Sequence, residues 1–163
     1  MPYMSTTVAN NILSRTFRDN ILETPMKLQK ILYFTASEYA KKTGRALLAD
    51  SFLTWAYGPV VSPVYAEFRP FSKQNITRYS KDAVGKSVVV DERSDPALQA
   101  ALDTVWDATK HRTAVDLSNI THLEGSAWDQ AFQKEDPRLD NDAIREDRTY
   151  CGPLNLPMSV GHP

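Results

Sequence analysis

The sequence has little of what secreted, membrane-bound or nucleotide-binding proteins use. It contains one cysteine, Cys151, among 163 residues, which excludes an internal disulfide and fits a reducing cytoplasm. No apolar run approaches the roughly 20 residues that cross a bilayer, and the N-terminus lacks the basic and apolar regions of a signal peptide. The six glycines never form the phosphate-binding patterns GxGxxG or GxxxxGK. We therefore expect a cytoplasmic protein with no membrane partner.

The chain also lacks an excess of charge of either sign. Its 19 Lys and Arg residues stand against 20 Asp and Glu residues, which gives a formal net charge of −1. Proteins that bind nucleic acid mainly by electrostatics carry a clustered basic excess, so nucleic acid is not expected as a partner of this domain. The histidines at positions 111, 122 and 162 are far apart in the sequence, and Cys151 has no CxxC partner. The sequence thus predicts no metal site and no cofactor.

The chain contains enough hydrophobic residues to form one folded core. The hydrophobic share is 42%, within the ordinary range of globular domains. We expect a single domain over residues 1–150. An irregular or mobile C-terminal tail is expected over residues 151–163, where prolines and glycines gather.

Apolar residues at helical spacing, together with capping residues, predict seven helices. They begin near Thr6, Thr24, Ser62, Asp95, Thr113, Ser126 and Asp142. The second is the best defined, because Thr24 can cap it, Pro25 suits its first position and Gly44 stops it. A β-hairpin is predicted around Gly85, where the segments NITRYS and KSVVVDE flank the loop DAVG. The expected fold class is mainly α, a compact helical domain with one small β-hairpin.

The second helix is predicted to lie at the centre of the fold. One of its faces carries Leu28, Ile31, Leu32, Thr35 and Tyr39. Met26 and Tyr33 lie roughly opposite, where a surface helix would carry polar side chains. The helix is therefore covered on both sides, or a partner covers one of them. Its basic residues, Lys27 and Lys30 among them, are interpreted as a solvated face.

Three segments are unusually rich in aromatic and small residues: PMKLQKILYF, FLTWAYGPVVSPVY and LSNITHLEGSAW. A packed core explains their aliphatic positions. It explains Tyr33, Trp55, Tyr57, His122 and Trp128 less well, because each has a polar group that needs a partner when it is buried. Residues of this kind are frequent where proteins bind other proteins.

The candidate catalytic residues do not form a recognisable active site. His122 stands between Thr121 and Glu124, with Cys151 as a further nucleophile, and this leaves a small hydrolase using His122 as an alternative. The simpler interpretation is that Thr121 and His122 end a helix and tie the turn at Gly125 by hydrogen bonds. We therefore expect no enzymatic activity.

At the same three segments the chain resembles the Panacea family of SocA-like antitoxin domains, also described as GepA-type phage-associated proteins. Residues 24–34 match the family helix pattern TxxKLQKLLYF. The two later patterns match at Phe52, Trp55, Tyr57, Gly58, Pro59, Val60, Val64 and Tyr65, and at Leu117, Ser118, Thr121, His122, Glu124 and Trp128. The chain departs from the family pattern at Ala127, where proline is usual, and after Asp140, where little matches.

The resemblance implies a mainly helical, cytoplasmic antitoxin of a type II toxin-antitoxin system. Such a protein is encoded beside a protein toxin and neutralises it by direct binding, with no enzymatic activity. The alternative that the family suggests is an adaptor that delivers the toxin to a protease. In that case the tail from Cys151 would engage a protease or chaperone.

We expect the toxin to bind a preformed surface centred on the second helix and on residues 55–60. Pro59 narrows the conformations of this loop, and Trp55 and Tyr57 offer large contact area at little rotamer cost. Gly58-Pro59 is interpreted as a stiff turn. The candidate toxin-binding or motif residues are Met26, Lys27, Lys30, Tyr33, Trp55, Tyr57, Gly58, Pro59, Val60, Thr121, His122 and Trp128.

Two further predictions concern the direction in which individual side chains of these motifs point. Tyr33 and Met26, on the unusual face of the second helix, either support the loop or touch the partner. Tyr65 is expected to face the core together with Phe68.

Overall fold

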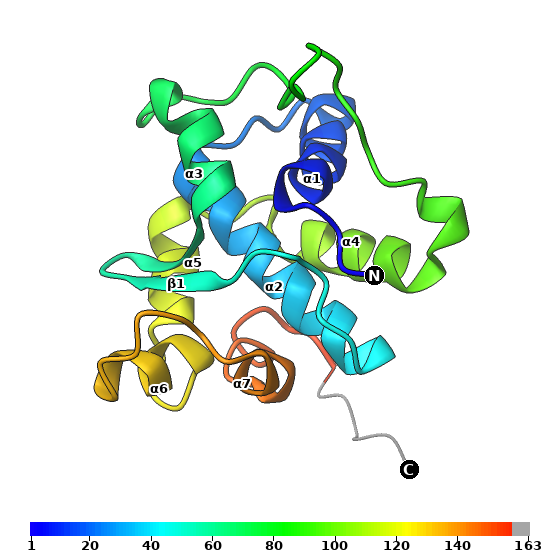
Figure 1. The fold of residues 1–163 in the computed structure, drawn as a ribbon. Coiled ribbons are helices and arrows are strands. Elements are labelled where there is room, and N and C mark those ends of the chain that lie inside the picture. The colour runs from blue at the N-terminus through cyan, green and yellow to red at the C-terminus, as the bar shows by residue number, and fades with distance from the viewer. Residues whose placement is uncertain (158–163) are drawn as a thin grey trace.

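The computed structural model describes residues 1–157, and Figure 1 shows their path. Within that range the chain forms seven α-helices and one two-stranded antiparallel hairpin, which confirms the predicted fold class. The helices are α1 (Ser5–Asp19), α2 (Pro25–Thr43), α3 (Ser62–Phe68), α4 (Pro96–Thr109), α5 (Ala114–Thr121), α6 (Ala127–Gln133) and α7 (Asn141–Glu146). The strands are β1 (Phe52–Trp55) and β2 (Gly58–Val61), and the 3₁₀ helices are η1 (Arg69–Phe71) and η2 (Glu92–Ser94). No helix in the described range is both long and apolar enough to span a bilayer.

Side-chain caps set the starts of most of the predicted helices, although α1 and α3 begin without one. Thr24 Oγ1 accepts a hydrogen bond from the Lys27 amide at 3.3 Å, and Gly44 ends α2 with a φ of 72°. The starts of α4, α5 and α6 are capped in the same way by Asp95, Thr113 and Ser126. These boundaries are local features of the chain, and the predictions for them are confirmed.

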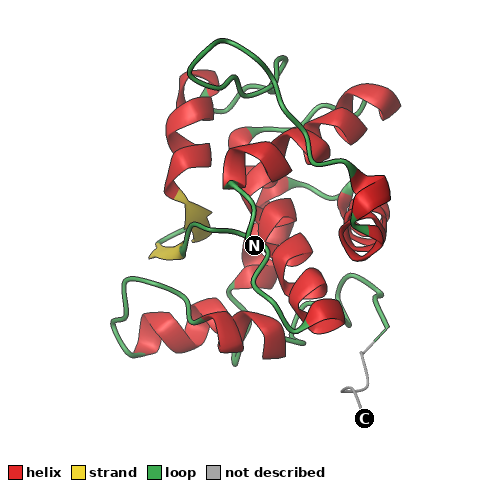
Figure 2. Cartoon of the chain, turned by 45° about the vertical axis from the view of Figure 1, so that its right-hand side comes forward, coloured by secondary structure: helices red, strands yellow, loops and turns green. Residues whose placement is uncertain are grey.

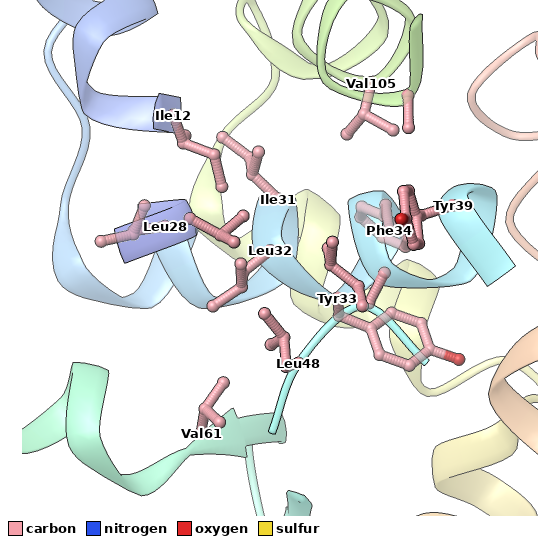
Figure 3. Close-up of a cluster of buried hydrophobic side chains, with 14 of the residues drawn as sticks. Ile12, Leu28, Ile31, Leu32, Tyr33, Phe34, Tyr39, Leu48, Val61 and Val105 are labelled. Atoms are coloured by element: carbon pink, nitrogen blue, oxygen red, sulfur yellow. The ribbon is translucent and has the colours of Figure 1, made fainter. Parts of the chain in front are cut away.

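Helix α2 runs through the middle of the molecule (Figure 1), and every residue from Lys27 to Ala40 is buried. It contacts α1, α4, α5, α7 and β2. In Figure 3, Ile12 of α1, Val105 of α4 and Val61 of β2 surround the side chains of α2. The predicted central position of this helix is confirmed, and the rest of the chain covers it on both sides.

The hairpin does not lie where the sequence pattern predicts it. Residues 75–91 contain no strand, and the strands that pair are β1 and β2, joined by the two-residue turn Ala56-Tyr57. The hairpin predicted around Gly85 is therefore wrong. The interpretation of Gly58-Pro59 as the turn is also wrong, because both residues lie in β2.

Side chains of α1 hold the backbone of this other segment in place of a partner strand. Asn10 Nδ2 donates to the carbonyls of Ser80 and Val88, each at 3.0 Å, and Asn10 Oδ1 accepts from the Ser80 amide at 2.8 Å. Asn11 makes the same reciprocal pair with the backbone of Val90, at 3.0 and 2.8 Å. Two asparagines from α1 thus satisfy groups that a hairpin would have paired, and no pattern within residues 75–91 reveals it.

The outer edge of β1 is also covered. The Thr54 amide donates to the carbonyl of Pro137 at 2.9 Å, and the Leu139 amide donates to the carbonyl of Phe52 at 2.9 Å. An isolated two-stranded hairpin is marginally stable in water, so such covering contacts are needed to hold it in place. Figure 2 shows the hairpin (yellow) leading directly into α3.

The segment that follows α7 forms turns and packs on the core. Tyr150, Cys151 and Leu154 are buried, and the Tyr150 hydroxyl donates to the carboxylate of Glu38 in α2. The start of the expected C-terminal tail is thus irregular but held against the domain. The remainder of that tail, residues 158–163, lies outside the described residues.

Candidate functional site

The turn of the hairpin is held by side chains from α5 and α6. The carbonyl of residue 55 accepts from Trp128 Nε1 at 2.8 Å, and the carbonyl of residue 57 accepts from Ser118 Oγ at 2.6 Å. Between them, the carbonyl of residue 56 lies 3.0 Å from His122 Nε2. Three consecutive backbone groups are therefore fixed by the third motif of the sequence.

The ring of His122 is occupied on both of its nitrogens. Nδ1 lies 2.6 Å from the carbonyl of Ser118, opposite the contact that Nε2 makes with Ala56. The Trp128 ring packs edge-on against it at a centroid distance of 4.0 Å. Thr121 and His122 end α5 as predicted. The Thr121 carbonyl accepts from Ser126 Oγ at 2.8 Å across the turn at Gly125, whereas His122 ties the hairpin turn instead.

The free edge of β2 is bound by side chains of α2. Gln29 pairs reciprocally with the backbone of Val61: its Nε2 donates to the carbonyl at 3.2 Å, and its Oε1 accepts from the amide at 2.9 Å. Lys30 Nζ donates to the carbonyl of Pro59 at 3.4 Å. Gln29 therefore takes the place of a neighbouring strand. In this way the motif in α2 holds the motif that forms the hairpin.

At Gly58 the hairpin passes close to both supporting helices. Its φ of 114° is a conformation that L side chains rarely adopt. A Cβ at this position would lie 2.7 Å from Thr121 Oγ1 and 3.0 Å from Lys30 Nζ. The buried Thr121 is itself fixed, because its hydroxyl donates to the carbonyl of Ser118 at 2.6 Å. Glycine is thus required here by both conformation and space.

A groove of about 290 Å³ opens between the start of α2, the hairpin and the segment from α3 to residue 73. Its lining is mostly apolar and aromatic. The lining residues are Pro25, Met26, Gln29, Lys30, Trp55, Tyr57, Val60, Tyr65, Arg69, Ser72 and Lys73. The structure thus brings together Met26, Lys30 and the three predicted loop residues Trp55, Tyr57 and Val60.

The aromatic side chains at this groove are accessible to a partner. Trp55 and Tyr57 are 37% and 70% exposed, although the backbone that carries them is fixed. Tyr65 is 40% exposed and packs edge-on against Trp55 at a centroid distance of 4.8 Å. The expectation that Tyr65 faces the core is therefore wrong, because α3 turns this side chain toward the hairpin.

The lysines at the start of α2 are buried, which corrects their interpretation as a solvated face. Lys27 forms an ion pair with Glu23 at 2.9 Å and donates to the carbonyl of Lys110 at 3.0 Å. Lys30 is 1% exposed, and its burial lowers the pKa of the ammonium group to about 8. The rest of the chain covers both lysines, so they form no solvated face.

Tyr33 lies in the core, away from the groove. Its hydroxyl donates to Asp147 at 2.5 Å, and its ring packs edge-on against Phe52 of β1 at 5.5 Å. Of the two roles considered for this residue, these contacts favour support of the hairpin. Met26 is half-buried and lines the groove, so it is placed to touch a partner.

Sequence reasoning missed Gln29, Ser118, Arg69 and Lys73 as parts of this site. A signal existed for Gln29, a polar residue among the apolar positions of a helix predicted to be covered on both sides. Arg69 and Lys73 reach the groove through the tertiary placement of the chain after α3, which no local pattern indicates.

Comparisons with known proteins agree with the positions of these motifs. The family model described as antitoxin SocA-like, Panacea domain, matches residues 28–129. A relative named Antitoxin SocA, from Caulobacter vibrioides (strain NA1000 / CB15N), is 28% identical over 125 residues. That match covers 75% of this chain and 66% of the relative, so the chain spans just under two thirds of the relative's length. No solved structure matches the chain.

Proposed function

This chain belongs to the family of SocA-like antitoxins that carry the Panacea domain, and on that premise we propose that it is the antitoxin of a type II toxin-antitoxin system. It acts in the cytoplasm and neutralises a protein toxin encoded beside it by direct binding. The family match supports this proposal because residues 28–129 include most of α2, the hairpin and α3, which line the groove, and α5, which fixes the hairpin turn.

The observation that carries the proposal is the contrast between a fixed backbone and exposed aromatic side chains at the hairpin. Hydrogen bonds from α2, α5 and α6 hold the hairpin on both sides of its turn, while Trp55 and Tyr57 remain open to solvent. A surface that is ordered before binding loses little conformational entropy when the partner arrives. Tyr and Trp are also the side chains that most often supply the energy of protein interfaces.

The geometry of His122 supports a binding role over hydrolysis. Both ring nitrogens lie against main-chain carbonyls, and neither is hydrogen-bonded to a hydroxyl or thiol of the described residues that could act as a nucleophile. Cys151 is buried, and desolvation raises the pKa of its thiol, which disfavours the reactive thiolate. We propose on these grounds that neutralisation proceeds without catalysis.

The adaptor alternative gains no support from the described part of the tail. An adaptor segment must be accessible to a protease or chaperone. Cys151 and Leu154, at the start of that segment, are 1% and 3% exposed and hold it against the domain, so that only Gly152, Pro153, Asn155 and Pro157 of residues 151–157 are exposed. Blocking of the toxin by binding is therefore the function that we favour.

Co-expression with the neighbouring toxin tests the proposal. The variants Trp55→Ala and Tyr57→Ala are expected to fold, since both side chains are exposed, and to lose protection of growth. Val84→Ala is a suitable control, because Val84 is 77% exposed and lies outside the groove lining. Full protection by both folded aromatic variants would overturn the assignment of the groove as the toxin-binding surface.

A further inference from the structure

The charged residues of the groove are all basic. Lys30, Arg69 and Lys73 line it, and no Asp or Glu is among its lining residues. None of the three forms an ion pair with a carboxylate in residues 1–157. The whole chain is close to neutral, so this local excess of positive charge is a property of the groove.

Lys30 differs from the other buried lysines of α2. Lys27 pairs with Glu23 at 2.9 Å, and Lys41 pairs with Glu38 at 3.3 Å. Lys30, which is 1% exposed, has no carboxylate partner in the described chain. Two lysines of α2 therefore have a carboxylate partner, Glu23 before the helix and Glu38 within it, whereas the lysine at the groove has none in the described chain.

The hydrogen bonding of Lys30 is also incomplete. An ammonium group has three donors. Within the described residues, Lys30 Nζ makes one long hydrogen bond, to the carbonyl of Pro59 at 3.4 Å. Thr121 Oγ1, which lies near this region, donates to the carbonyl of Ser118, and no hydrogen bond joins it to Lys30 within the described residues. A buried charge with so few partners lowers stability unless something else supplies the missing acceptors.

We propose that the groove binds an acidic side chain of the toxin, and that this carboxylate pairs with Lys30 Nζ. Apolar side chains on either side of the acidic residue pack against Met26, Trp55 and Tyr65. Arg69 and Lys73, both exposed, add favourable charge at the groove for the same segment. The inference rests on the proposed function, because it names the chemistry of the partner at the same surface.

The walls of the groove favour a carboxylate over a phosphate. A carboxylate side chain reaches a buried ammonium on an aliphatic stem, which suits walls made of Met26, Trp55 and Val60. A phosphate group carries more charge and more acceptor oxygens than one buried lysine can pair.

Short peptides blocked at both ends test the inference without the toxin. The probes are acetyl-Leu-Glu-Leu-amide and its neutral match acetyl-Leu-Gln-Leu-amide, with acetyl-Leu-Gln-Leu carrying a free C-terminal carboxylate as a third arm. Binding is followed by NMR through the Trp55 indole N–H. We expect the Glu peptide to bind about tenfold more tightly than the Gln peptide. Lys30→Met should abolish this preference, and Lys73→Met should preserve most of it.

Three outcomes would overturn the inference. They are equal affinities of the Glu and Gln peptides for the wild-type protein, a Glu preference that survives in Lys30→Met, and tighter binding of the peptide with the free C-terminus. The first and third use the wild-type protein alone, so they hold even if Lys30→Met fails to fold. The toxin is absent from the measurement. Failure here therefore leaves the proposed function standing, whereas full growth protection by both Trp55→Ala and Tyr57→Ala would separately overturn the groove as the toxin-binding surface.

Discussion

Gly58 is the residue at which the three sequence motifs meet. It belongs to the hairpin, and its Cα lies against Thr121 of α5 and Lys30 of α2. The sequence indicated that this glycine mattered, but assigned it to a turn. Glycine is needed at this position because φ is positive inside a strand and because the neighbouring side chains leave no space for a Cβ. Both conditions arise from tertiary packing.

Replacing Gly58 by alanine should destabilise the protein more than replacing a glycine in open space. Gly58→Ala combines an unfavourable φ with a 2.7 Å contact to Thr121 Oγ1, and we expect a loss of about 3 kcal/mol in the free energy of unfolding. Gly85→Ala has a φ of 82° but no atom within 4 Å, so a loss of about 1 kcal/mol is expected. Urea denaturation measures both. Equal losses would show that the close approach contributes nothing.

Because Lys30 is buried, we expect the free energy of unfolding to rise at alkaline pH. Burial lowers the pKa of its ammonium group from 10.5 to about 8. Between these two values the unfolded state binds more protons than the folded state, so the free energy of unfolding increases with pH in this window. The increase should be on the order of 3 kcal/mol.

The control for this prediction is Lys30→Met, which lacks the titrating group. It should be more stable than the wild-type protein at neutral pH, because a poorly paired buried charge is replaced by an apolar side chain. The two stability curves should converge as the pH rises from about 8 to 10.5. Curves that run parallel over this range would contradict a buried, charged Lys30.

At the scale of elements, the sequence predicts helices well and the hairpin badly. Thr24, Asp95, Thr113 and Ser126 cap their helices through hydrogen bonds within a few residues, so their effect is visible in the sequence. The pairing of β1 with β2 depends on Gln29, far away along the chain. Three consecutive valines at positions 88–90 resemble a strand, but Asn side chains of α1 hold that backbone instead.

Removing one of these asparagines should release the segment that it holds. Asn10→Ala leaves the buried amide and carbonyl of Ser80 without their partner, and we expect a loss of about 2 kcal/mol. The Ser80 amide should also exchange its hydrogen faster. Asn119→Ala, at an exposed position of α5, is the control and should change neither quantity. Unchanged protection of the Ser80 amide in Asn10→Ala would mean that other contacts hold the segment.

At the scale of the molecule, the three sequence motifs pack together and hold one another in place. Helix α2 is the centre of the core and also binds the free edge of β2, while α5 and α6 fix the turn. The sequence revealed which residues belong together, because Trp55, Tyr57 and Met26 do meet at one groove. It could not reveal that Tyr33 lies in the core and Tyr65 at the surface, since both depend on how α3 and the hairpin pack.

The most direct test of the account is the affinity of the purified protein for its proposed toxin, the product of the neighbouring gene, measured by titration calorimetry. If the fixed hairpin presents the binding surface, Trp55→Ala should raise the Kd about 30-fold, a loss near 2 kcal/mol, while its unfolding curve stays that of a folded protein. Val84→Ala should bind like the wild type. A folded Trp55→Ala protein that binds the toxin with unchanged affinity would contradict the central claim.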